Sequence, residues 1–273
     1  MSRHTISEPW RNDPFIRECA DGYLAARGME RAQPRGRVAM ERARGIRIAD
    51  TFETMPHRPD DPCVAAAYEQ FAREIGDQFE FVLCFAGMSM EPWLRSGQPY
   101  RGSTDMFRDV YCNRHLYFFT TSSGYGEACG LNNPLRAPTG TTIDGHELLV
   151  NDMFRCVHDF FGHALAGFEF GPSGEESAWL EHSRMFSPLA RAALTTETRG
   201  QSCWFNFGAH LRDEHGRLRT RGQERWIPRR QRPFPPQKAG LLPAWASGVE
   251  VIPSATPGRV HARPLAGWSA TAS

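Results

Sequence analysis

The sequence predicts an α+β fold that is mostly helical, with a few short antiparallel strands beside the helices. Apolar residues recur at helical spacing over residues 62–76 and in segments from about residue 149 to 204. Two stretches rich in Val, Phe and Tyr, Phe79 to Phe85 and Val110 to Thr121, have instead the composition of strands. The helical part is the larger, and it carries the residues with the clearest chemical pattern.

The chain divides by composition near residue 60. Residues 1–60 are rich in arginine and interrupted by prolines, so we expect an amino-terminal arm of short helices and loops. Residues 61–273 are expected to form the main domain, which carries the candidate metal-binding and catalytic residues described below. Within it, Asp144-Gly145 predicts a hairpin turn, because this dipeptide favours the tight turns that join antiparallel strands.

Charge and cysteine content exclude several classes of protein. A net charge of +1 over 273 residues argues against a dedicated nucleic-acid binder, and the arginine-rich segment Arg217 to Arg232 is expected to be a solvated loop. No apolar run is long enough for a bilayer, so we expect a cytoplasmic protein without a membrane partner. The seven cysteines lack paired short spacing, which predicts reduced thiols. Cys156 and Cys203 fall in helical segments and are expected in the core.

Two histidines in an apolar segment are the most informative feature. His158 and His163 lie five positions apart, with Gly162 directly before the second. On a straight α-helix five residues turn through roughly 500°, which leaves the two rings about 140° apart. One shared metal ion therefore requires a π-bulge, or a helix end at Gly162. The alternative is one core histidine and one surface histidine.

Glu197 is the predicted third ligand. Ser187-Pro188 is a helix start signal, and on the helix that follows Glu197 shares a small, apolar face with Leu189 and Ala193. No cationic residue lies three or four positions away, so a metal ion would stabilise this inward carboxylate. The alternatives are an ion pair with a distant arginine or a carboxylate that reaches solvent.

Other polar residues nearby have structural explanations. Ser173-Gly174-Glu175-Glu176 fits a capping box, with Glu176 returning to the Ser173 amide. His182 is expected to be a hydrogen-bonded core histidine, although a ligand or a donor to a ligand is the alternative. Asp159 falls on the polar face of its helix, but it is adjacent to His158, where a carboxylate could orient the imidazole or a bound co-substrate.

Two histidines and a carboxylate serve two chemistries. With open positions this set is the usual Fe(II) oxygenase arrangement, whereas the same ligands holding zinc and a water support hydrolysis. Zinc hydrolases of the His-Glu-x-x-His type place their histidines at i and i+4 with an intervening general base. Here the spacing is i and i+5 and the acidic residue is Asp159.

The pattern His158-Asp159-x-x-Gly162-His163, followed by Thr195-Thr196-Glu197, resembles the iron site of the pterin-dependent aromatic amino acid hydroxylases. The motif of that family reads His-Glu-x-x-Gly-His, and its two histidines and a later glutamate hold iron. The resemblance covers roughly residues 145–205. It implies a hydroxylase-like fold, Fe(II) bound by His158, His163 and Glu197, and a reduced pterin as further cofactor. Asp159 replaces the glutamate that contributes to the pterin environment in the family.

The predicted function is therefore a mononuclear non-heme Fe(II) oxygenase or hydroxylase. Its expected partners are O2 and a small-molecule substrate, an amino acid or a derivative of one, and a homo-oligomer is compatible with the sequence. Because guanidinium groups bind carboxylates bidentately, the candidate substrate clamps are Arg155, Arg199 and Arg136. Trp179 is the candidate aromatic wall, and Asp159 the candidate catalytic carboxylate. The alternatives are a zinc hydrolase and a non-catalytic binding protein with a structural metal.

Overall fold

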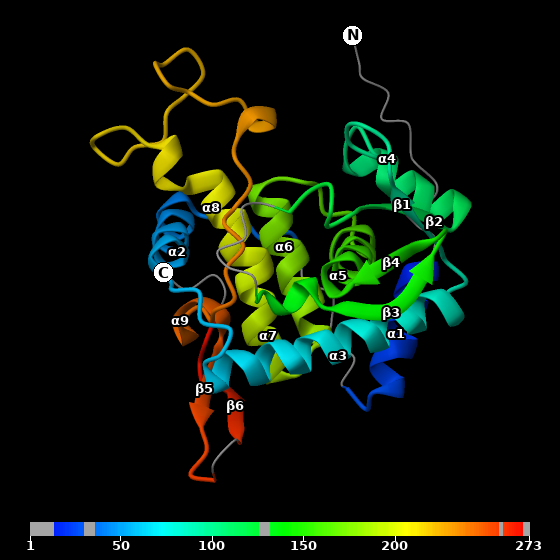
Figure 1. Ribbon diagram of the computed structural model, residues 1–273. Helices are drawn as coiled ribbons and strands as arrows, with labels where there is room; N and C mark the ends of the chain where they lie inside the picture. The colour runs from blue at the N-terminus through cyan, green and yellow to red at the C-terminus, as the bar shows by residue number, and fades with distance from the viewer. Residues whose placement is uncertain (1–13, 30–35, 126–131, 257–258, 270–273) are drawn as a thin grey trace.

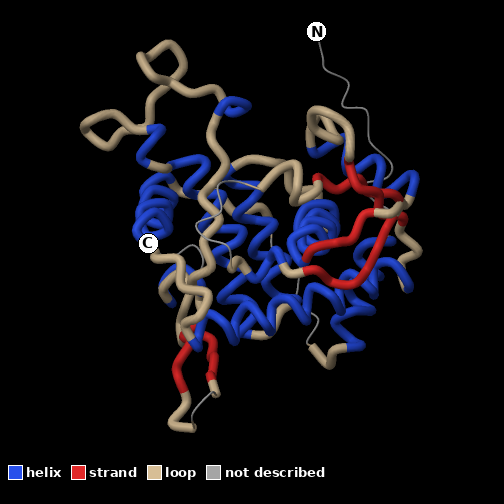
Figure 2. The backbone as a smooth tube through the Cα atoms, viewed as in Figure 1, coloured by secondary structure: helices blue, strands red, loops and turns tan. Residues whose placement is uncertain are grey.

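Helices dominate the computed structural model, which describes residues 14–29, 36–125, 132–256 and 259–269. The strands form three separate two-stranded pairs among these residues (Figure 2). The α-helices are α1 (Phe15–Ala26), α2 (Arg42–Thr54), α3 (Pro62–Cys84), α4 (Ser103–Arg108), α5 (Val150–Val157), α6 (Pro172–His182), α7 (Pro188–Thr195), α8 (Gln201–Phe207) and α9 (Ala244–Ser247). The strands are β1 (Ser89–Trp93), β2 (His115–Phe119), β3 (Pro138–Ile143), β4 (His146–Leu149), β5 (Val249–Pro253) and β6 (Val260–Pro264).

The long helix α3 organises the main core. It runs beneath α5 and α7 in Figure 1 and contacts both of them. Its buried aromatic residues, among them Tyr68 and Phe71, meet Phe154 of α5 and Phe186 before α7. A smaller core forms where α2 packs on α8, around Phe52 and Phe207. The mostly helical prediction is confirmed.

The strand predicted at Phe79 to Phe85 was wrong. These residues continue α3, which ends at Cys84. Phe79 and Val82 are buried whereas Phe85 is exposed, so the apolar positions follow a helical face. A short apolar run does not distinguish a buried helix from a strand by its composition. Packing of this end of α3 on α1, with Phe81 against Tyr23, decides for the helix.

The stretch Val110 to Thr121 is a strand only in its second half. A π-helical turn over Asp109–Asn113 precedes β2. The strand β2 pairs with β1 in parallel, with Met90 opposite Leu116, so the expectation of antiparallel strands was wrong here. Parallel strands need a crossover connection, which the segment containing α4 provides.

The other two pairs are antiparallel, as predicted. The turn between β3 and β4 is the predicted Asp144-Gly145 hairpin turn. Both residues have positive φ values, 49° and 76°, as tight hairpin turns of this kind require.

The described part of the first 60 residues contains short helices, as predicted, but it does more than cover the surface. Ile16 and Tyr23 of α1 belong to the main core, and Phe52 of α2 to the second one. Residues 1–13 and 30–35 of the predicted arm lie outside the described residues. In the described part of the chain, no helix combines the length and the apolar character that crossing a membrane requires.

The segment Arg217 to Arg232 follows α8 and consists largely of exposed loops that extend away from the helices (Figure 1). The exposure of the first part of this segment agrees with the prediction of a solvated loop. Its last residues behave differently, because Arg229 and Arg232 return to the body of the protein and contact Asn206 at the end of α8.

Candidate metal centre

A π-helical segment, η4 (His158–Ala164), brings the two histidines together. The amide of Leu165 donates to the carbonyl of Phe160, five residues earlier, over 3.1 Å. Residues five apart therefore come to one side of the helix. The ring centroids of His158 and His163 lie 5.1 Å apart at 84°, and the predicted π deformation is confirmed.

Gly162 permits this arrangement. A β-carbon at this position would lie 3.0 Å from Nδ1 of His158 and 3.3 Å from the carbonyl oxygen of Ala178 in α6. Any side chain here would push against the histidine ring on one side and the neighbouring helix on the other. The glycine thus allows α6 to pack closely on η4 while His158 keeps its position.

Glu175 joins the two histidines from the first turn of α6. Its Oε2 atom lies 3.4 Å from Nε2 of His163. One donor atom from each of His158, His163 and Glu175 lies within 4.8 Å of the other two. Neighbouring ligands on one ion are about 3 Å apart, so a small contraction would let all three bind the same ion.

The hydrogen bonds of His163 direct its Nε2 atom toward Glu175. Its Nδ1 atom donates to the carbonyl of Phe168 over 2.7 Å. Burial alone would lower the pKa of His163, but Glu175, Asp159 and the Phe168 carbonyl raise this pKa to about 9. In the metal-free protein a proton on Nε2 therefore occupies the space between the imidazole and the carboxylate. A divalent cation would displace this proton from Nε2 and be coordinated by the same carboxylate.

A chain of side chains sets the orientation of His158. The Nε2 atom of Gln78 donates to the Met185 carbonyl over 3.2 Å, so its Oε1 atom faces Nε2 of His182 at 2.7 Å. His182 then donates from Nε2, which leaves its Nδ1 atom as an acceptor. The Nδ1 atom of His158 lies 3.2 Å from it and donates to it. This network assigns the free lone pair of His158 to Nε2, the atom available to a metal.

His158 is neutral in this setting. Burial, with His163 and His182 as neighbouring imidazoles, holds its pKa well below the usual range. His182 is fully buried, and burial lowers its pKa to about 3. The expectation of a hydrogen-bonded core histidine at position 182 is confirmed, and that histidine also contacts a candidate ligand.

Glu197 lies on a second π-helical segment, η6 (Thr196–Gly200), which follows α7. The predicted helix start is confirmed, with Ser187 as N-cap and Pro188 as the first helical residue. Among the described residues, however, Glu197 is outside the group formed by the two histidines and Glu175. Its carboxyl group accepts hydrogen bonds from Tyr68 and, over 2.6 Å, from Gln201. Burial raises the pKa of Glu197 to about 8, although these two bonds lower it.

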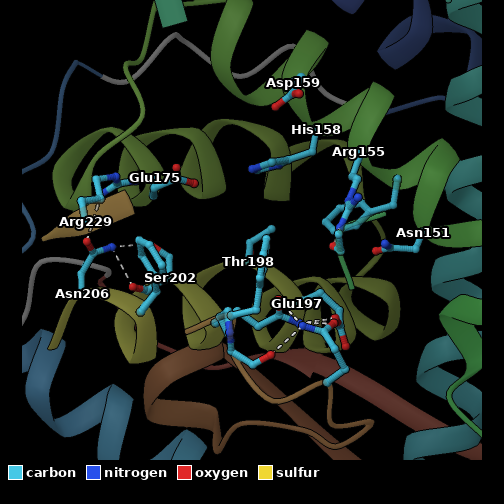
Figure 3. Close-up of a pocket in the computed structure, with 17 residues that line it drawn as sticks. Asn151, Arg155, His158, Asp159, Glu175, Glu197, Thr198, Ser202, Asn206 and Arg229 are labelled. Carbon is cyan, nitrogen blue, oxygen red and sulfur yellow. Dashed lines mark hydrogen bonds between the residues drawn. The ribbon is translucent and has the colours of Figure 1, made fainter. Parts of the chain in front are cut away.

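A cavity of about 360 Å³ lies between Glu197 and the candidate metal ligands. His158, Glu175 and Glu197 line it, and Figure 3 shows Glu197 on the side opposite His158 and Asp159. Sequence reasoning found His158, His163 and Glu197 but not Glu175. The one sequence signal that could have identified Glu175 is its position beside Glu176 at the start of a helix.

Asp159 and Arg155 both line the cavity, and both were predicted site residues. Asp159 is half-buried rather than on the exposed polar face, and burial raises its pKa to about 6. The guanidinium group of Arg155 donates to the carbonyls of Phe119 and Gly124. Two of its donors are thus used to hold the segment after β2 against α5.

The other predicted substrate residues have different positions. Arg199 pairs with Glu176, both almost completely buried, and its guanidinium group lies 4.3 Å from the ring of Trp179. The prediction of Arg199 as a substrate clamp is corrected, because its donors are used within the core. Trp179 is fully buried and donates to Thr195, so it is a core residue and not a cavity wall. Arg136 is exposed and lies outside the residues that line this cavity.

The predicted capping box at the start of α6 was wrong. The helix begins at Pro172 after Gly171, and the hydroxyl of Ser173 accepts instead from the Met40 amide over 3.1 Å. Glu176 turns inward to Arg199, so its structural role is confirmed by a different contact. Glu175 is thereby left facing the histidines.

Comparison of the chain with family models, with curated proteins and with solved structures gave no match. The relation to the hydroxylases thus stays a resemblance of a short motif.

Proposed function

We propose that this protein is a mononuclear non-heme Fe(II) oxygenase that acts on a small molecule, with His158, His163 and Glu175 as the iron ligands. One observation carries the proposal: a π-helical turn places two imidazoles beside a carboxylate at the wall of a cavity. Two histidines and one carboxylate with open coordination positions are the usual ligand set of Fe(II) oxygenases.

The donor atoms fit a divalent ion. Nε2 of His158 has a free lone pair, because the proton of this imidazole is on Nδ1, which donates to His182. Nε2 of His163 faces a carboxylate that already attracts a positive charge. Iron bound there would supply the activation of O2.

The residues around the cavity have roles of their own. Glu197 holds a proton near neutral pH and lies across the cavity from His158, where it can donate to a bound substrate. Asp159 adds a second carboxyl group beside the ligands. Arg155, fixed by the Phe119 and Gly124 carbonyls, provides a positive wall for an acidic substrate. An amino acid or its derivative is the substrate class that the resemblance implies, and a reduced pterin the electron donor.

A zinc hydrolase is the second candidate, and the protonated Glu197 favours it specifically. A carboxyl group with a pKa of about 8 is a suitable general acid for hydrolysis beside a zinc-bound water. A purely structural metal is favoured less, because structural zinc sites are closed whereas these ligands border an open cavity.

The test is to load the protein with Fe(II) under anaerobic conditions and to add nitric oxide, a stable substitute for O2. The oxygenase proposal expects the electron paramagnetic resonance signal of a ferrous nitrosyl centre, lost in His158→Ala. Absence of this signal from iron-loaded protein would contradict an open iron site. Hydrolytic activity restored by Zn(II) without O2 would establish the hydrolase instead.

A further inference from the structure

A second cavity, of about 500 Å³, adjoins the metal cavity. The two share Phe205, Arg229 and Phe234 as lining residues. Their walls therefore form one continuous surface from the histidines to the end of the Arg217 to Arg232 segment. A ligand held in the second cavity can extend past Arg229 toward the metal ligands.

The second cavity is strongly positive. Among the described residues, four arginines line it and neither an aspartate nor a glutamate does; the arginines are Arg101, Arg229, Arg230 and Arg232. Arg229 and Arg232 hydrogen-bond only neutral acceptors in the described structure, chiefly the side-chain oxygen of Asn206. Some other arginines pair with carboxylates, as Arg199 does with Glu176 and Arg212 with Asp50. The positive charge of this cavity is thus left without a counter-ion in the described part of the protein.

One nitrogen atom of the Arg232 side chain lacks a hydrogen-bond partner among the described residues. This atom is the buried Nε. Burial and the neighbouring Arg229 lower the pKa of Arg232. A buried donor without an acceptor is costly, so the folded protein holds this guanidinium group beside Arg229 at a cost in free energy.

Aromatic side chains complete the cavity. Phe170 and Phe234 are exposed large apolar residues, 38% and 54% accessible, and both line this cavity. The guanidinium groups of Arg229 and Arg232 lie 5.1 Å and 5.6 Å from the ring of Phe205. The cavity therefore combines several guanidinium groups with apolar surface, which suits an anionic group attached to an apolar or aromatic body.

We propose that this arginine cavity binds the phosphate group of a small organic phosphate whose apolar part extends into the metal cavity. The inference rests on the proposed function, and it replaces the amino acid class that the resemblance implies with an organic phosphate as the substrate of the same site. A phosphate dianion offers three oxygens to several guanidinium groups, whereas a single carboxylate satisfies one of them. The formal net charge of +1 disfavours a nucleic-acid strand.

The experiment is calorimetric titration of the metal-free protein at low ionic strength with three related probes: phenyl phosphate, benzoate and benzyl alcohol. Metal-free protein excludes direct phosphate–metal contacts. We expect phenyl phosphate to bind at least tenfold more tightly than benzoate, and benzyl alcohol not to bind measurably. The double variant Arg229→Gln/Arg230→Gln should weaken phenyl phosphate binding about tenfold or more, because charge-assisted hydrogen bonds are lost.

Arg221→Gln is the matched control, because this exposed arginine belongs to the same segment but does not line the cavity. It should leave binding unchanged. Arg230→Gln alone removes an exposed guanidinium group, so a smaller loss with an unaltered melting temperature separates binding from folding.

Three results would overturn the inference: no binding of phenyl phosphate, equal binding of benzoate, or an equal loss in Arg221→Gln. Displacement of phenyl phosphate by a far more tightly bound single-stranded oligonucleotide would also overturn it. Because the titration contains no metal, the two proposals fail separately. Binding of phenyl phosphate, together with the absence of the ferrous nitrosyl signal from iron-loaded protein, would reject the oxygenase and leave the phosphate site standing.

Discussion

His158 and His182 face each other through their Nδ1 atoms, 3.2 Å apart. The chain continues from His182 to Gln78 and from Gln78 to the carbonyl of Met185. A candidate ligand on η4 is thus oriented by residues of α6 and α3. Groups that orient a ligand imidazole typically contribute 10- to 100-fold to metal affinity.

We expect His182→Ala to lower metal affinity by about 10- to 100-fold, because His158 loses the acceptor that fixes its tautomer and ring position. Competition with a chromophoric chelator measures this affinity. His261→Ala is the control, since this exposed residue lies on β6. Equal metal affinity in His182→Ala and the control would show that His158 needs no such support.

Gly162→Ala should impair the centre without a change in charge. The new methyl group would lie 3.0 Å from Nδ1 of His158, the atom that faces His182, so the ring must shift to make room. We expect at least a tenfold loss of metal affinity, measured by the same competition.

The control is Gly76→Ala in the middle of α3, where a β-carbon meets nothing within 4 Å. That change should stabilise the protein by about 0.5–1 kcal/mol, because alanine favours the helix over glycine. Metal affinity in Gly162→Ala equal to that of this control would contradict the steric role of Gly162.

The contribution of Glu197 to the stability of the metal-free protein should fall as pH rises from about 4.5 to about 8. Burial raises the pKa of this carboxyl group from 4.5 to about 8 in the folded protein, with Tyr68 and Tyr125 as its titratable neighbours. The folded state therefore holds a proton that the unfolded state releases above about pH 4.5. The contribution is fully present below that pH and decreases toward pH 8, by up to about 1.4 kcal/mol per pH unit.

Urea denaturation at several pH values measures this dependence. Glu197→Gln keeps the shape of the side chain and removes its titration, so the stability of the wild type relative to this variant should fall between pH 5 and pH 8. A difference that stays constant or rises over this range would show that Glu197 is ionised in the folded protein.

Arg199 should matter for folding and not for substrate binding. Arg199→Met leaves Glu176 as a buried carboxylate without its partner, which typically costs about 3–5 kcal/mol of the free energy of unfolding. Chemical denaturation measures the loss. The double variant Arg199→Met/Glu176→Leu should recover much of it. A stable Arg199→Met protein that binds substrate poorly would restore Arg199 as a clamp.

The sequence was most informative where local geometry decides. The i, i+5 histidines with Gly162 required a deformed helix, and Ser187-Pro188 marked a helix start; both features are present. The place of Glu175 in the site was not predictable from the sequence, because only tertiary packing brings α6 against η4. Adjacent Glu175 and Glu176 gave no local reason for one to face the histidines and the other to face Arg199.

Long-range pairing explains the other differences. Phe79 to Phe85 have strand-like composition, yet α3 continues through them until Cys84 because its apolar face is buried there. The arginine cavity joins Arg101 to Arg229 and Arg232, from segments far apart in the chain. The number of charges in the Arg217 to Arg232 segment could not by itself reveal that its last arginines line a cavity beside the metal cavity.

The central claim is that His158, His163 and Glu175 bind one metal ion, and metal content per chain tests it most directly. The measurement compares wild-type protein, Glu175→Gln and Glu197→Gln, each loaded anaerobically with Fe(II) and dialysed. The described geometry predicts about one iron per wild-type chain, retention in Glu197→Gln and loss in Glu175→Gln. Iron retained by Glu175→Gln and lost from Glu197→Gln would contradict it and identify Glu197 as the third ligand.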